Sequence, residues 1–174
     1  MTTGVLVLLG LVALAGLLLT LRGERRPVVI GGAVALVGAL AVAAGLAWIG
    51  QGVGTGALQG GVVLAVLAAV TGGSPVTTAV LHAADPAAAG VTGGPQDPDI
   101  LRGGAWIGVL ERAAIAGTLL GGWPEGLAVV LAVKGLGRFS ELRAPAAAER
   151  FIVGTLASAL WAAACVGVVA LLRL

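Results

Sequence analysis

The sequence is poor in the residues on which soluble proteins and metalloenzymes depend. Only 10% of its 174 residues are charged, tyrosine is absent, and cysteine and histidine occur once each. Soluble domains carry about 25% charged residues, so the composition argues against a soluble protein. A lone cysteine, Cys165, excludes an intrachain disulfide and a cysteine metal site. Since HExxH and nucleophile-elbow motifs are also missing, we expect no metal and no other cofactor.

Apolar residues make up most of the chain instead. They account for 59% of it, and the mean hydropathy is +1.08. Long apolar runs separated by short polar breaks are typical of α-helical membrane proteins, so we predict an all-α, polytopic helical bundle in one transmembrane domain, residues 1–174. The 30 glycines are expected to let helices approach closely, as at Gly52, Gly56 and Gly60. No basic segment precedes the first apolar run, so we do not expect a cleaved signal peptide.

The apolar runs divide the chain into six predicted spans and one shorter helix. A helical span needs about 20 apolar residues, and the segment 76–89 is too short and too polar for one. We predict that it is a re-entrant or interfacial helix. The predicted spans cover residues 4–21, 28–49, 57–72, 104–121, 124–141 and 147–172.

The positions of the arginines predict the orientation of these spans. Basic residues gather in cytoplasmic loops, and most arginines here fall at one end of the predicted bundle. That end is assigned to the cytoplasm, which places both termini outside; only Arg173 opposes the assignment. The same arginines explain the formal net charge of +2, so we expect no nucleic-acid partner. The cytoplasmic set is Arg22, Arg25, Arg26, Arg102, Arg138, Arg143 and Arg150.

The most informative stretch is Gly103–Gly122, an apolar run with Glu111 and Arg112 at its midpoint. A charge at the centre of a span costs at least about 2.5–3.5 kcal/mol and usually faces a bundle interior or a wet cavity. Neighbouring side chains point about 100° apart on a helix, so the two cannot both lie in one narrow seam, and their partners must come from other helices. The candidate partners are Lys134, Arg138, Glu141, Glu149 and Arg150.

The lone histidine has two interpretations. His82 and Asp85 are three residues apart and would share a helix face, as in a proton relay or one edge of a metal site. A partly exposed, hydrogen-bonded histidine is the simpler interpretation, and the one we favour. Glu111 is a further candidate for carrying a proton, if burial favours its neutral form.

Charged residues recur at fixed places in the apolar helices between Gly103 and Gly167, in GGAWIGVLER, AVKGLGRFSELR and AAERFIVGTLASALWAAACVG. These stretches resemble a family of bacterial multi-pass integral membrane proteins of unknown function. The resemblance implies a place in the bacterial cytoplasmic membrane, and it supplies no activity. The site residues that it implies are Glu111, Arg112, Lys134, Arg138, Glu141, Glu149, Arg150, Thr155 and Ser158.

Several functions fit this cluster. Its four bases outnumber its three acids, so a small anionic or zwitterionic solute would complete it, and we predict binding or transport of such a solute. The alternatives are internal ion pairs that only fix helix register, an enzyme acting on a lipid or polyprenyl phosphate, and an accessory subunit of a membrane complex. The expected partners are membrane lipids, another membrane protein, or a second copy through the pairs Gly104/Gly108 and Gly117/Gly121.

Overall fold

The computed structural model describes residues 1–22, 26–50, 53–84, 104–139, 143 and 145–174. Within these residues the chain is helical, with no strand, which confirms the all-α fold class. The helices are α1 (Thr2–Arg22), α2 (Arg26–Ile49), α3 (Thr55–Ala84), α4 (Gly104–Leu120), α5 (Gly126–Gly137) and α6 (Pro145–Leu172).

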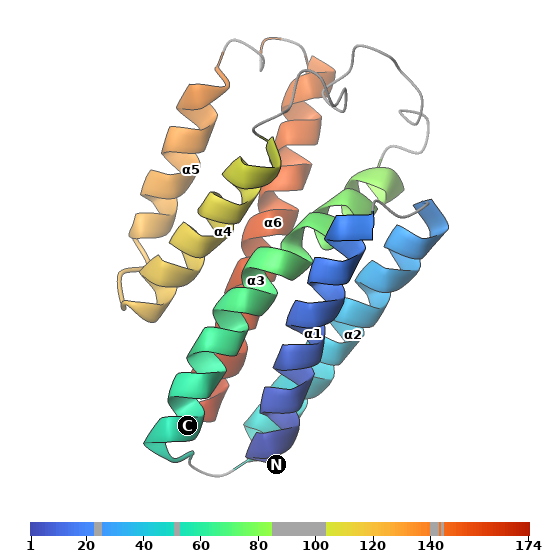
Figure 1. Ribbon diagram of the computed structural model, residues 1–174. Coiled ribbons are helices and arrows are strands. Elements are labelled where there is room, and N and C mark those ends of the chain that lie inside the picture. The colour runs from blue at the N-terminus through green and yellow to red at the C-terminus, as the bar shows by residue number, and fades with distance from the viewer. Residues whose placement is uncertain (23–25, 51–52, 85–103, 140–142, 144) are drawn as a thin grey trace.

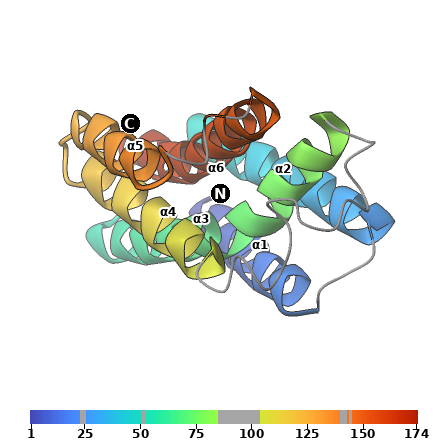
Figure 2. The same cartoon turned by 90° about the horizontal axis from the view of Figure 1, so that it is seen from above.

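Successive helices run in opposite directions, so both termini lie at the same end of the bundle (Figure 1). The longest helices, α3 and α6, pack against each other and form the centre. The hairpin of α1 and α2 covers one side of this pair, and α4 packs on the other. Figure 2 shows α5 at the edge of the bundle beside α4.

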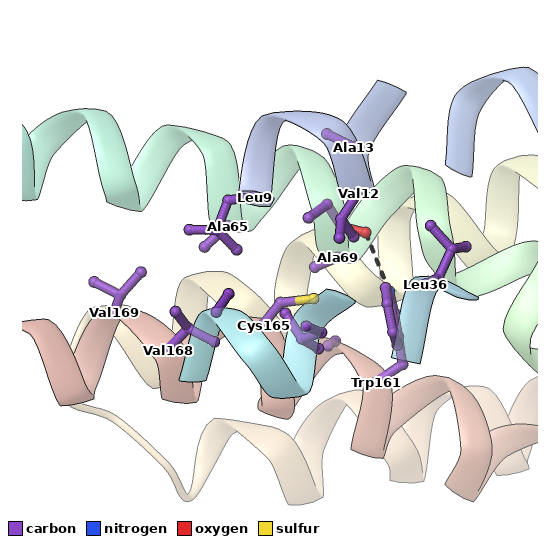
Figure 3. Close-up of a cluster of buried hydrophobic side chains, with 14 of the residues drawn as sticks. Leu9, Val12, Ala13, Leu36, Ala65, Ala69, Trp161, Cys165, Val168 and Val169 are labelled. Atoms are coloured by element: carbon purple, nitrogen blue, oxygen red, sulfur yellow. Dashed lines mark hydrogen bonds between the residues drawn. The ribbon is translucent and has the colours of Figure 1, made fainter. Parts of the chain in front are cut away.

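Small residues allow the central helices to approach closely. A Cβ on Gly16 of α1 would lie 2.6 Å from the Cα of Gly72 in α3, so these two backbones are in contact. On the opposite side of α3, a Cβ on Gly72 would lie 2.6 Å from the ring of Trp161 in α6. The Trp161 indole donates a hydrogen bond of 3.1 Å to the carbonyl of Ala68, which ties α6 to α3 in the core (Figure 3). Cys165 is fully buried in the same core.

Other glycines lie outside these contacts. The predicted packing through Gly56 and Gly60 is wrong, because nothing lies within 4 Å of a Cβ built on either, and Gly52 is outside the described residues. The spacing of these glycines shows which ones share a face, but it does not show which face meets another helix.

In the described part of the chain, four helices are long and apolar enough to cross a membrane: α1, α2, α3 and the stretch 147–172 of α6. Large apolar side chains point outward from them, among them Leu11, Val34 and Leu160, as expected for surfaces that contact lipid. These features fit an integral membrane protein. The hairpin of α4 and α5 is shorter, and α5 ends at Gly137 instead of reaching residue 141. Its 12 residues extend about 18 Å, less than a bilayer core of about 30 Å.

The predicted break between residues 72 and 76 is wrong. The structure has one helix of 30 residues where we predicted a span over 57–72 and a separate helix over 76–89, and Pro75 lies inside it. Residues 85–89 are outside the described part of the chain. The ribbon of α3 bends along its length (Figure 1), as helices do at an internal proline. The helix continues because neighbouring helices satisfy the backbone groups that the proline leaves free.

Candidate functional site

The site begins at this proline in α3. Pro75 has no N–H, so the carbonyl of Thr71, four residues earlier, loses its helical hydrogen bond. The hydroxyl of Thr20 on α1 lies 3.3 Å from that carbonyl and 2.8 Å from the carbonyl of Gly16 in its own helix, so it shares its one proton between the two. The Thr71 hydroxyl in turn lies 2.8 Å from the carbonyl of Ala13 on α1. Helix α1 therefore supports α3 at the point where its backbone bonding is interrupted.

Arg112 of α4 reaches the same turn from the opposite side. Only 3% of the residue is exposed, and its Nε and Nη2 donate to the carbonyl of Val70 at 3.1 and 2.9 Å. Nη2 also donates to the hydroxyl of Ser74 at 3.0 Å, and Nη1 to that of Ser158 on α6 at 3.5 Å. In the part of the chain that the structure describes, all hydrogen-bond partners of Arg112 are neutral oxygens. The ion pair with an acid that we considered for Arg112 is therefore absent among these residues.

Two glycines make room for the guanidinium group. A Cβ on Gly73 would overlap the Arg112 side chain at Cδ, and one on Gly108 would lie 3.1 Å from Nη1. Any side chain at Gly73 would push Arg112 away from Val70. The sequence Thr71-Gly-Gly-Ser-Pro75 thus combines a free carbonyl, space for a large cation and a hydroxyl acceptor.

The side chain of Glu111 points to α5, away from the α3 and α6 partners of Arg112, because adjacent side chains on a helix point about 100° apart. Its Oε2 accepts a hydrogen bond of 2.5 Å from Nζ of Lys134 on α5, and the two side chains are only 12% and 18% exposed. The ammonium group also lies 5.7 Å from the ring centroid of Phe151 on α6, close enough for a cation–π interaction. The other carboxylate oxygen, Oε1, is buried without a hydrogen-bond partner.

Two buried hydroxyls at the contact of α3 and α6 also have no hydrogen-bond partner among the described residues. They belong to Thr77, one turn after Ser74, and Thr155, one turn before Ser158. The Thr77 methyl group lies 3.7 Å from the position of a Cβ on Gly154, so Thr77 packs against α6 at the residue before Thr155. Buried polar atoms are rarely left unpaired, and each exception calls for an explanation.

These side chains form one layer across four helices, which we call the polar seam. Taken together, Glu111, Lys134 and Arg112 carry a formal charge of +1, which the described residues of the seam do not neutralise. Such a layer offers an anionic group a buried cation and hydroxyl donors, and offers a donor group an unpaired carboxylate oxygen. The seam consists of Ser74, Thr77, Glu111, Arg112, Lys134, Thr155 and Ser158.

The remaining predicted site residues lie elsewhere. Glu149, exposed, and Arg150, partly buried, begin α6, and Glu149 is about 13 Å along the helix from Ser158. Arg138 is partly buried in the turn after α5. His82, also partly buried, lies near the end of α3, where its carbonyl accepts a hydrogen bond of 3.0 Å from Arg26 of α2. Glu141 and Asp85 fall outside the described residues.

Part of the seam was not predicted from the sequence. The signal was present in TGGSP, an apolar helix interrupted by glycines, a proline and two hydroxyl residues, which we interpreted as a helix end. The family resemblance stays a prediction. Comparisons with protein-family models, with curated proteins and with solved structures found no match.

Proposed function

We propose that this protein binds a small anionic or zwitterionic solute at the polar seam and carries it across the bacterial cytoplasmic membrane. One observation carries the proposal: the buried charge of Arg112, bonded among the described residues to neutral oxygens only, beside a helix with an internal proline. Transporters commonly build their solute sites near the middle of the membrane, where the regular bonding of a helix is broken. An intramembrane cation of this kind usually marks a functional site.

The hydrogen bonds of Arg112 indicate how a solute would be held. Nε and Nη2 anchor the guanidinium to α3, whereas the single bond of Nη1, to Ser158, is long at 3.5 Å. A guanidinium has five N–H groups, and one of those on Nη1 has no acceptor among the described residues. An anionic oxygen at Nη1 would gain a charge-assisted hydrogen bond without disturbing the anchor. The Pro75 region of α3 would act as the hinge when the seam opens.

In this proposal all six helices cross the membrane, with both termini outside. The alternating helix directions and the common end of the two termini support this arrangement (Figure 1). The short helix α5 then crosses a locally thinned region beside α4, where Lys134 is paired with Glu111.

The test combines ligand screening with uptake. Purified protein would be screened by thermal shift against acetate, inorganic phosphate, glutamate and alanine, with choline as a cationic control. Any solute that stabilises the protein would then be measured, radiolabelled, for uptake into proteoliposomes. We expect Arg112→Gln to abolish both effects, while Arg143→Gln, which removes the same charge from an exposed position, leaves them intact. Absence of any stabilising solute would contradict the proposal and favour the structural or accessory-subunit role.

A further inference from the structure

The unpaired atoms of the seam differ in what they require. The hydroxyls of Thr77 and Thr155 can donate or accept, and both are buried without a partner. Oε1 of Glu111 is an ionised carboxylate oxygen in its pair with Lys134, so it can only accept. A ligand that satisfies all three atoms must therefore bring a hydrogen-bond donor as well as an acceptor.

Contacts within the seam connect these atoms through neighbouring side chains. Thr77 packs against α6 at Gly154, the residue before Thr155, and Thr155 lies one helical turn from Phe151. The ring of Phe151 lies under the ammonium group of Lys134, and that group holds Glu111. Neighbouring side chains therefore link the acceptor to the two hydroxyls within the seam. The acceptor and the hydroxyls come from α3, α4 and α6, the helices that also surround Arg112.

We infer that the solute of the polar seam is a small zwitterion with a protonated amine, such as an α-amino acid, and not a simple anion. This inference rests on the proposed function. The carboxylate of the solute accepts hydrogen bonds from Nη1 of Arg112 and from the hydroxyls of Thr77 and Thr155. Its ammonium group donates to Oε1 of Glu111.

A simple anion suits this arrangement poorly. It would bring a second negative charge towards Glu111 and would leave Oε1 without a donor. A simple cation is disfavoured as well, because it would meet the positive charges of Arg112 and Lys134 and would offer nothing to the guanidinium. Only a solute with both groups pairs with each side of the seam.

Matched ligand pairs test the inference on the unaltered protein. Equilibrium dialysis would compare alanine with propionate, valine with isovalerate and glutamate with glutarate, which differ only in the α-ammonium group. We expect at least one amino acid to bind about tenfold or more tightly than its partner, since a charge-assisted hydrogen bond contributes about that much. The N-trimethyl form of that amino acid keeps the positive charge but has no N–H, so it should bind as weakly as the deaminated partner.

The outcomes separate this inference from the proposed function. Equal binding within every pair would overturn the zwitterion and leave a solute-binding protein. Binding of inorganic phosphate or acetate alone would do the same, and binding of no solute at all would overturn both proposals. A second variant locates the contact: Glu111→Gln should reduce the preference within a pair about tenfold, while Glu149→Gln, outside the seam, should preserve it. An unchanged preference in Glu111→Gln would overturn the assigned role of Oε1.

Discussion

The ion pair of Glu111 and Lys134 gives the most quantitative prediction. Its side chains are 12% and 18% exposed and its atoms 2.5 Å apart, so each charge depends on the other for its stabilisation. Removing one member of a buried pair costs about 3–5 kcal/mol, because the remaining charge stays buried without a partner. Lys134→Met keeps the length of the side chain but leaves the Glu111 carboxylate unpaired. Glu111→Gln keeps the shape of its side chain and leaves the ammonium group with only Phe151 beside it.

The double variant should be far milder than either single one. With both charges gone, no buried charge is left unpaired. The free energy of unfolding of Glu111→Gln/Lys134→Met is therefore expected within about 1 kcal/mol of that of the unaltered protein. The assay is reversible unfolding in mixed micelles, followed by tryptophan fluorescence, for all four members of the cycle. The expected coupling free energy exceeds about 2 kcal/mol, within the range of residues in direct contact. A coupling below about 0.5 kcal/mol would refute the buried pair, because solvated pairs give values of that size.

Three further predictions concern packing. Gly73→Ala should destabilise the protein by about 1–3 kcal/mol in the same assay, because the added Cβ overlaps the Arg112 side chain. Gly117→Ala, whose Cβ has nothing within 4 Å, should be neutral or slightly stabilising. Equal effects of the two substitutions would contradict the close contact of Gly73 with Arg112. Trp161→Phe should lower the free energy of unfolding by about 1–3 kcal/mol, since it removes the hydrogen bond to α3 and part of a buried ring. An unchanged unfolding midpoint would contradict the contact of Trp161 with α3. Cys165, fully buried and the sole cysteine, should resist maleimide labelling until the protein is unfolded, and rapid labelling of folded protein would show that this core is open.

The helical fold class and the importance of Glu111 and Arg112 follow from the sequence alone. Charged side chains at the middle of an apolar span must face the bundle interior or a wet cavity, because lipid cannot solvate them. The sequence also predicted that the partners of both residues would come from other helices, because adjacent side chains cannot both lie in one narrow seam. Lys134 was among the candidates for Glu111 because it is a cation inside another apolar run. The partners of Arg112 were not predicted, since a backbone carbonyl such as that of Val70 has no signature in the sequence.

The continuity of α3 shows why such features depend on tertiary structure. Proline inside a helix normally ends it, and this local rule predicted a break before residue 76. The rule fails here because the Thr20 hydroxyl lies 3.3 Å from the carbonyl that Pro75 leaves free, and Arg112 holds the same turn of α3 through the carbonyl of Val70. Both donors come from helices far away in the sequence. Only the register between helices determines whether such donors reach the gap.

The most direct test of the polar seam as a solute site is native mass spectrometry of gently solubilised protein, with extraction and identification of whatever remains bound. We expect one small solute per chain in the unaltered protein, lost in Arg112→Gln and retained in Arg143→Gln. A solute with both an amine and an acidic group would support the zwitterion as well. A folded protein that carries no solute, and gains none when the matched amino acids are added, would contradict the account and leave the seam as internal structure.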